Sequence, residues 1–383
     1  MLTNEDIKDL VSFRRDLHRR PELSGKETNT AKTISGALNS LAPDELISGL
    51  GGHGVAAVFD SGREGPTLLF RAELDALPIE EASGAEWSSE VPGKAHLCGH
   101  DGHMTILVAL ARLLSRRRPR KGRCVLMFQP AEEDGSGARA VVADPKFTSI
   151  RPDWAFAIHN EPGLPFGYVG IKPGLINCAS RGLAIALKGR TSHAAEPELA
   201  SSPVSALPEM LSALDDLGTG GELDDSFRLS TVTHVSVGEA TFGITPGDAT
   251  IFVTLRASRD KAVTDLQNSA ESIILELAAD HGLACEFAVH DDFAASMNDP
   301  EAVDVACRAM EGLGIPFGDK GVPMRASEDF GAFGWQAKAA MLCLGPGESH
   351  VALHQPEYDF PDDLIPVGAR IFDRIRRDLL GQS

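Results

Sequence analysis

Three short, almost uninterrupted apolar runs are the features that most constrain the fold of this 383-residue chain. They are TLLFRAELD at 67–75, CVLMFQ at 124–129 and WAFAIH at 154–159. Between the first two lies TILVALARLL at 105–114, whose apolar residues follow helical spacing. Apolar strands that alternate with helices are typical of a sheet that is buried on both faces. The sequence therefore predicts an α/β domain.

A different order of elements is predicted in the middle of the chain. Strand patterns and helical patterns follow one another there as strand 182–189, helix 202–217, strands 226–238 and 249–258, helix 261–282 and strand 283–290. This is the β-α-β-β-α-β order of the ferredoxin-like arrangement. We therefore expect an α/β domain, residues 1–179 and 294–383, interrupted by an inserted α+β domain, residues 180–293.

Charge and composition restrict the partners. The formal net charge of −19 argues against nucleic acid and anionic lipid as binding partners. The N-terminal stretch MLTNEDIKDL lacks the features of a signal peptide, and no apolar run approaches the roughly 20 residues of a membrane span. The six cysteines include no CxxC pair, which favours reduced thiols in the cytoplasm.

Side chains suited to metal binding or proton transfer follow the predicted strands directly. The first strand ends at Asp75, the second runs into Glu132 and Glu133, and the third ends at His159. The stretch HLCGHDGH at 96–103 immediately precedes a predicted helix. Ligands of open α/β sheets bind outside the carboxyl ends of the strands. We therefore expect these four segments to converge on one edge of the sheet.

The residue types indicate metal chemistry. Cysteine, histidine and glutamate together suit a borderline-soft ion such as Zn²⁺, and Mn²⁺ or Co²⁺ with less preference. Glu132 and Glu133 are adjacent, so one carboxylate can hold the metal while the other carries a proton. Metal-assisted hydrolysis needs this division of roles.

Other interpretations stay open at this point. HLCGHDGH taken alone fits a structural metal site. Cys98 could instead act as a nucleophile with His100 as its base, although the two lie close in sequence for such a pair. A third interpretation is a non-catalytic metal-binding or sensor protein. The second carboxylate, that of Glu132, argues against it, because a purely structural metal site does not need that group.

Ordered motifs along essentially the whole chain resemble one family. The chain is similar to the M20 metallopeptidases and amidohydrolases, and most of all to their aminoacylase, hippurate hydrolase and indoleacetyl-amino-acid hydrolase subgroup. The motifs are FRRDLHRRPELSGKE (13–27), RAELDALPIEE (71–81), HLCGHDGH (96–103), FQPAEEDGSGA (128–138), SHAAEPE (192–198), SEDF (327–330) and LHQPEYDF (353–360).

The resemblance implies a fold and a cofactor. It implies a mixed-sheet, zinc-peptidase-like catalytic domain with an inserted ferredoxin-like domain that serves as a lid and in dimerisation. It also implies two divalent ions per chain, zinc or manganese first and cobalt or nickel next. The ligands it implies are Cys98, which would bridge the ions, and His100, Glu133, His159 and His354.

The resemblance also implies roles in catalysis. Glu132 would be the general base, and Asp75 would orient a metal ligand. His193 would reach into the partner subunit's site and stabilise the developing oxyanion, so the catalytic unit would be a homodimer or a higher homo-oligomer.

Two positions bear on substrate binding. The family's inserted domain carries an asparagine where this chain has Gly243, so one substrate contact is expected to be missing. Arg256 lies at a family arginine position. It would either bind a substrate carboxylate or pair within the inserted domain.

The resemblance implies a hydrolase that acts on linear amides. Its substrates would be small N-acyl amino acids or similar N-acyl amines, which it would cleave to a carboxylate and a free amino group. The alternative within the same family is a dipeptidase or aminopeptidase.

Overall fold

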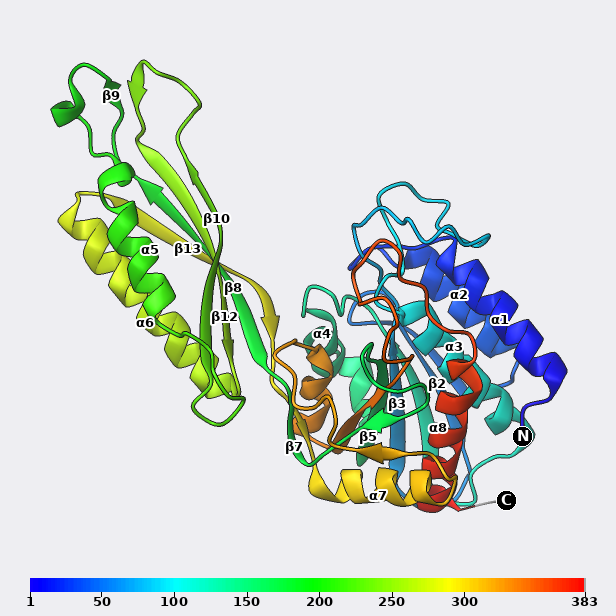
Figure 1. The fold of residues 1–383 in the computed structure, drawn as a ribbon. Helices are drawn as coiled ribbons and strands as arrows, with labels where there is room; N and C mark the ends of the chain where they lie inside the picture. Colours follow the sequence, from blue (N-terminus) through cyan, green and yellow to red (C-terminus); the bar gives the residue numbers. More distant parts are fainter. Residues whose placement is uncertain (382–383) are drawn as a thin grey trace. The chain divides into compact units, whose positions relative to one another are not determined.

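The computed structural model describes residues 1–381, which form two compact units. The first unit comprises Met1–Ile176, Ser296–Pro323 and the chain from Glu328 onward. The second comprises Asn177–Ala295 and Met324–Ser327. Figure 1 shows the fold of both units.

The first unit contains an eight-stranded mixed sheet. β3 is parallel to β4 and to β5, and β5 is parallel to β16. β2 is antiparallel to both β1 and β4, and β6 is antiparallel to β16. In spatial order the strands are β1 (Glu45–Leu50), β2 (Gly54–Asp60), β4 (Arg123–Gln129), β3 (Thr67–Glu73), β5 (Trp154–Asn160), β16 (Lys338–Leu344), β6 (Val169–Gly170) and β15 (Phe317–Gly318).

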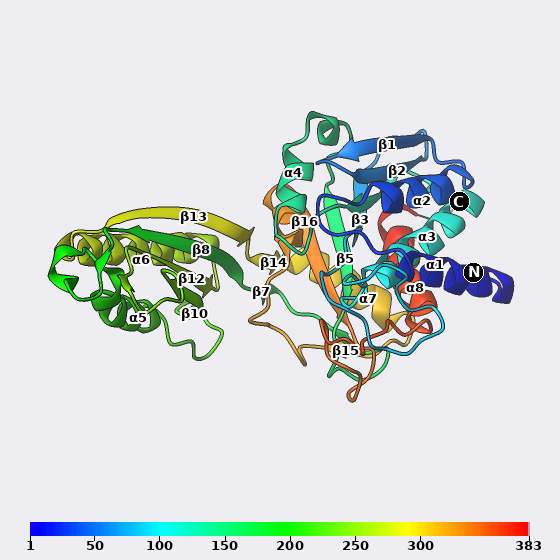
Figure 2. The same cartoon turned by 90° about the horizontal axis from the view of Figure 1, so that it is seen from above.

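Burial of the central strands explains the apolar runs in the sequence. Every residue of β3 is buried, and six of the seven residues of β4 are buried. Helices lie on both sides of the strands, with α4 on the side away from α3 and α8 (Figures 1 and 2). The prediction of an α/β domain with a sheet buried on both faces is therefore confirmed.

The helices of the first unit surround this sheet. α1 begins with a capping box in which Thr3 and Asp6 exchange hydrogen bonds, and α3 begins directly after Gly99. The helices and 3-10 turns are α1 (Asn4–His18), α2 (Thr28–Asn39), α3 (His100–Arg116), α4 (Gly137–Ala143), η1 (Pro145–Ile150), α7 (Pro300–Glu311), η4 (Asp329–Trp335) and α8 (Leu364–Leu380).

The second unit has the element order β8-α5-β10-β12-α6-β13. Its four strands form an antiparallel sheet in the order β10-β12-β8-β13, and α5 and α6 pack on it. In β8, the buried Leu183, Ile185 and Leu187 alternate with more exposed residues, as expected where one face of a sheet is covered. The bounds are β8 (Ala179–Lys188), α5 (Leu207–Asp216), β10 (Arg228–Val237), β12 (Asp248–Ala257), α6 (Asp260–Asp280) and β13 (Ala284–Phe293).

Several short elements complete the described chain. β9 (Ser192–His193) pairs with β11 (Ile244–Thr245), and β7 (Gly174–Asn177) pairs with β14 (Ser296–Asn298). Two 3-10 turns, η2 (Pro197–Leu199) and η3 (Pro203–Ser205), precede α5. Across residues 1–381, no helix combines the length and apolar character that a bilayer crossing requires.

Candidate metal centre

The carboxyl ends of β3, β4 and β5 bring the predicted side chains to one place, as the sequence led us to expect. The loop that opens α3 and the loop that follows β16 reach the same edge of the sheet. The five side chains that gather there are Cys98, His100, Glu133, His159 and His354.

Cys98 lies at the centre of this cluster. Its Sγ is 3.4 Å from Nε2 of His159 and 3.4 Å from Nε2 of His354. It belongs to two groups whose ligand atoms lie within 4.8 Å of one another, one with His100 and His159 and the other with Glu133 and His354. A sulfur shared by two donor groups is the geometry that a bridging thiolate needs.

Glu133 connects the two groups. Its Oε1 lies 3.8 Å from Nε2 of His100, and its Oε2 lies 3.8 Å from Nε2 of His354. These distances exceed that of a hydrogen bond. The atoms therefore face one another across a space without contacting directly.

Two histidines present an acceptor nitrogen to the cluster. Nδ1 of His100 lies 2.8 Å from the carbonyl oxygen of Asp75, and Nδ1 of His159 lies 2.9 Å from that of Asn160. Because a carbonyl can only accept, Nδ1 carries the proton in both rings. In the neutral ring, Nε2 is then the atom with the lone pair, as a metal ligand requires.

Close packing explains the two glycines of HLCGHDGH. Gly99 has a φ of +89°, and a Cβ there would lie 2.0 Å from Oδ1 of Asn160. A Cβ at Gly102 would lie 2.4 Å from the ring of Phe360. Side chains at either position would displace the loop that carries Cys98 and His100.

Left-handed backbone also occurs beside the cluster. His354 has a φ of 63°, and Ala131, directly before Glu132, has a φ of 51°. Residues other than glycine rarely adopt such angles, and they cluster at functional sites where surrounding structure holds them. Glu27 supplies part of that support, since its carboxylate accepts the Ala131 N–H at 2.8 Å.

Burial shapes the electrostatics of the cluster. It raises the pKa of the Cys98 thiol well above its usual range, and the Glu133 carboxylate adds to this. Burial likewise raises the pKa of Glu133, to about 7, although His100 opposes the shift. Acidic groups this close together retain their protons unless a cation compensates their charge.

The residues present fit a divalent cation. Nε2 of His100 and Oε1 of Glu133 are buried and have no hydrogen-bond partner within the described chain. Buried polar atoms of this kind normally have a partner. Here they point to a ligand, and the mixture of sulfur, nitrogen and oxygen donors suits Zn²⁺ and related ions.

Asp75 forms hydrogen bonds with two of the proposed ligands, Glu133 and His100. Its carboxylate accepts the Glu133 N–H at 2.9 Å and the Ser24 hydroxyl at 2.7 Å. Its backbone carbonyl, rather than its carboxylate, accepts from His100, because the carboxylate oxygen is 3.6 Å from that ring. Asp75 can therefore orient both neighbours.

Glu132 has a different environment from Glu133. Its side chain is buried, its Oε2 lies 3.7 Å from Nε2 of His100, and it lies beside Glu328 and Asp329. Burial and the neighbouring Glu328 carboxylate raise the pKa of Glu132 well above its usual range. A carboxyl with a raised pKa is suited to accept a proton and to give it back.

A buried charge network beneath the cluster was not predicted. Arg71 donates to Glu73, to Glu328 at 2.8 Å and to Asp329 at 2.7 Å. The Glu73 carboxylate also accepts a hydrogen bond of 2.7 Å from Nδ1 of His103. One feature of the sequence does indicate such a network: Arg71 and Glu73 are charged residues within an apolar strand. Charges in a buried strand need partners.

The remaining three predicted residues belong to the second unit. His193 is exposed and pairs with Ile244, and Ala194 donates to the carbonyl of Gly243 at 3.1 Å. Arg256 donates to the carbonyl of Arg325 at 3.0 Å and to the hydroxyl of Ser327 at 2.8 Å. Arg256 therefore forms hydrogen bonds within the second unit, but neither acceptor is a carboxylate that would neutralise its charge.

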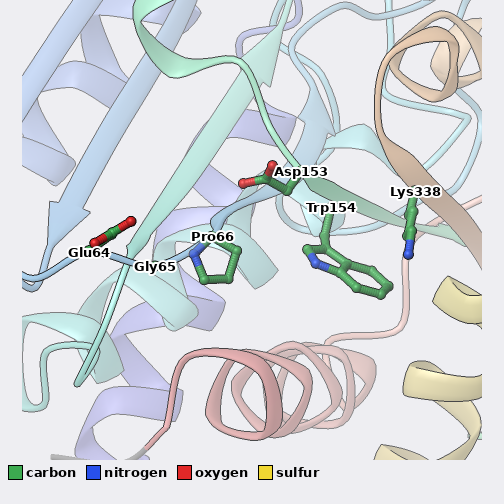
Figure 3. A pocket seen from close by; sticks show the side chains of 6 residues that line it. All are labelled: Glu64, Gly65, Pro66, Asp153, Trp154 and Lys338. Carbon is green, nitrogen blue, oxygen red and sulfur yellow. The ribbon is translucent and has the colours of Figure 1, made fainter.

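A shallow pocket lies at the opposite edge of the main sheet (Figure 3). Its volume is about 480 Å³, and it is formed where β3, β5 and β16 begin. It contains none of the predicted site residues. The residues that line it are Glu64, Gly65, Pro66, Asp153, Trp154 and Lys338.

Comparisons with known proteins agree with this arrangement. The model of peptidase family M20/M25/M40 matches residues 69–378. The hippurate hydrolase of Campylobacter jejuni is 30% identical over 375 residues, which cover 96% of this chain and 95% of that protein. The N-acetylcysteine deacetylase of Bacillus subtilis is 28% identical over 364 residues, which cover 95% and 94%.

A solved structure adds a likeness of fold. The Bacillus subtilis YXEP protein, described as a dinuclear metal binding peptidase from the M20 family, superposes with a TM-score of 0.79 at 26% identity. The match covers 98% of this chain and 99% of that one. The chain thus belongs to peptidase family M20/M25/M40.

Proposed function

We propose that this protein is a metal-dependent amidohydrolase that cleaves N-acyl amino acids to a carboxylate and a free amino acid. The observation that carries the proposal is the cluster around Cys98, with the separate carboxyl of Glu132 beside it. The relatives named above support it, because they are hydrolases of N-acyl amino acids by name.

The proposed ligands divide into two sets. Cys98, His100 and His159 would hold one divalent ion, and Cys98, Glu133 and His354 would hold the other. Zinc or manganese is the first expectation and cobalt or nickel the next. Such ions, when bound, lower the pKa of water and polarise a carbonyl group.

Proton transfer is assigned to Glu132. Its carboxylate would take a proton from the attacking water and later deliver it to the departing nitrogen. Burial and the neighbouring Glu328 carboxylate raise the pKa of this carboxyl, which makes it a stronger proton acceptor than an exposed glutamate. Asp75 would keep Glu133 and His100 in place through the two hydrogen bonds described above.

Roles for the second unit form part of the same proposal. With its β-α-β-β-α-β order, it would be the ferredoxin-like lid and dimerisation domain, residues 180–293, inserted into the catalytic domain, residues 1–179 and 294–383. His193 would stabilise the oxyanion in the partner's site of a homodimer. Arg256 would bind the substrate carboxylate, which is supported by its uncharged hydrogen-bond acceptors.

The protein would act in the cytoplasm. All six cysteines are free thiols in the described chain, which is typical of a reducing compartment. A hydrolase with Cys98 as its nucleophile is disfavoured. Burial raises the pKa of that thiol, whereas a nucleophilic cysteine needs a lowered pKa.

The test is hydrolysis of a panel of N-acetyl and N-benzoyl amino acids, with dipeptides for comparison. We expect release of free amino acid that disappears after chelation and returns when Mn²⁺ or Zn²⁺ is added. Chelator-resistant hydrolysis would contradict the metal mechanism. Faster cleavage of dipeptides than of any acylated amino acid would assign the protein to the peptidases of its family.

A further inference from the structure

Arg14 of α1 is a buried cation to which the proposed mechanism gives no role. It belongs to the segment FRRDLHRRPELSGKE, residues 13–27. Its side chain is fully buried, with 0% of its surface exposed. A guanidinium is costly to bury unless it is paired and hydrogen-bonded, so the groups that pair with it indicate what it holds in place.

Three carboxylates from separate segments surround Arg14. Nη1 donates to Asp101 at 3.2 Å and to Asp359, and Nε donates to Asp362 at 2.8 Å. Asp101 follows His100 directly in the first turn of α3. Asp359 and Asp362 lie between His354 and the start of α8. One side chain thereby joins α1 to two distant loops.

Those two loops carry the proposed ligands. Cys98 and His100 lie on one loop and His354 on the other, with the Cys98 Sγ and the His354 Nε2 3.4 Å apart. One backbone hydrogen bond links the loops directly near the ligands, from the His354 N–H to the Leu97 carbonyl at 2.9 Å. The left-handed backbone of His354 requires further support.

A third loop, which carries Glu81 and Trp87, reinforces the same contacts. Glu81 accepts from His18, which also contacts Asp101 at 2.8 Å. Further along, the Trp87 indole N–H donates to Asp359 at 3.0 Å. The carboxylates around Arg14 are therefore held from two sides, and their positions are fixed relative to α1.

We propose that Arg14 is a positioning residue that holds the Cys98–His100 loop and the His354 loop at the separation needed to bind the same pair of ions. The inference rests on the proposed metal site. The hydrogen bonds of Arg14 reach none of the proposed ligand atoms, so it would act through Asp101 and Asp359. Groups that hydrogen-bond directly to metal ligands typically change metal affinity by 10–100-fold when they are replaced. Arg14 lies one contact further from the ligands, so we expect an effect near the lower end of this range.

Two variants test this role. Arg14→Lys keeps the charge, but a single ammonium group cannot reproduce the fork that reaches three carboxylates. Asp359→Asn removes the charge of one partner of Arg14. The Asp359 side chain is 25% exposed, so this variant is less prone to misfold. Arg15→Lys is the matched control, because Arg15 lies on the same helix and donates to Asp362 without contacting Asp101 or Asp359.

The measurement is calorimetric titration of metal-free protein with Mn²⁺, alongside thermal unfolding of the same samples. We expect Arg14→Lys and Asp359→Asn to bind Mn²⁺ at least about 10-fold more weakly than the wild type. The melting temperature of Asp359→Asn should stay close to that of the wild type, whereas that of Arg14→Lys should fall because lysine leaves buried carboxylates short of a partner. Arg15→Lys should bind Mn²⁺ within about 3-fold of the wild type. Wild-type affinity in both test variants, or an equal loss in Arg15→Lys, would overturn the inference.

Failure of the proposed function has a different signature. Amide hydrolysis by the wild type is assayed on the same preparations. Suppose that the wild type hydrolyses no amide but that Arg14→Lys still weakens Mn²⁺ binding. This result would contradict the proposed function, and Arg14 would remain a positioning residue of a metal site.

Discussion

Replacement of Gly99 by alanine should destabilise the first unit by about 3 kcal/mol. Two costs add. The backbone at Gly99 has a φ of +89° and a ψ of 13°, and left-handed backbone costs a residue with a Cβ roughly 1–2 kcal/mol. The new Cβ would also lie 2.0 Å from Oδ1 of Asn160, so the asparagine has to move.

That movement breaks a buried hydrogen bond. Oδ1 of Asn160 lies 2.7 Å from Nε2 of His103, and loss of a partner for a buried polar group costs about 1–3 kcal/mol. The loop that carries Cys98 would shift together with the clash. Weaker metal binding should therefore accompany the loss of stability.

Urea unfolding followed by tryptophan fluorescence is the assay. The three tryptophans, Trp87, Trp154 and Trp335, all belong to the first unit, so the signal reports that unit. Gly163→Ala is the control: Gly163 has a φ of +94°, and a Cβ there meets nothing within 4 Å. It should cost only the backbone share, about 1–2 kcal/mol. Equal destabilisation of the two variants would refute the reasoning from the clash.

Two further predictions concern buried charges. Replacing Arg71 with methionine leaves Glu73, Glu328 and Asp329 buried without their common cation. The free energy of unfolding should fall by at least about 3–5 kcal/mol. A decrease below about 1 kcal/mol in the same urea assay would contradict the network. Burial lowers the pKa of His18, but the carboxylates of Asp101 and Glu81 together more than offset this and raise it to about 9. A histidine pKa raised by folding stabilises the protein fully below about pH 6.5, and this contribution disappears as the pH rises through about 9. The contribution of His18 to the stability of the wild type should thus fall by on the order of 3 kcal/mol between these pH values. The profile of His18→Gln should be flatter by this amount, and identical profiles would contradict the assignment.

The sequence predicted the site best where residues suited to metal binding or proton transfer stand at the ends of apolar strands. Asp75, the Glu132–Glu133 pair and His159 each follow or end such a strand, and the packing of parallel strands brings these ends together. The mixed character of the sheet could be stated only from the family resemblance. Nothing in the pattern of β2 distinguishes an antiparallel strand from a parallel one when both faces are buried.

Contacts between distant residues were beyond the reach of sequence patterns. Arg71 and Glu328 are 257 positions apart. A charge inside an apolar strand indicates that Arg71 has a buried partner, but no pattern in the sequence identifies Glu328 as that partner. For Asp75, the resemblance implied that it orients a ligand, but only the structure distinguishes its carboxylate, which accepts from Glu133, from its carbonyl, which accepts from His100. Such details depend on side-chain directions that tertiary packing decides.

The same limit applies to conformation. Two residues adopt the left-handed backbone conformation at the site: His354, a member of the cluster, and Ala131, which directly precedes Glu132. Local sequence predicts neither, because the αL region is costly for an alanine and is adopted by only a minority of histidines. The surrounding hydrogen bonds, such as that from the Ala131 N–H to Glu27, hold these angles.

Glu132→Gln tests the central claim most directly. The variant keeps the shape of the side chain and removes the proton acceptor, while the five proposed ligands stay unchanged. Metal content per chain and hydrolysis of an N-acyl amino acid should be measured on the same sample. We predict two divalent ions per chain, as in the wild type, and a rate lowered by about 10²–10⁴-fold or more. Hydrolysis within a few-fold of the wild-type rate, with both ions bound, would contradict the assignment of Glu132 as the general base.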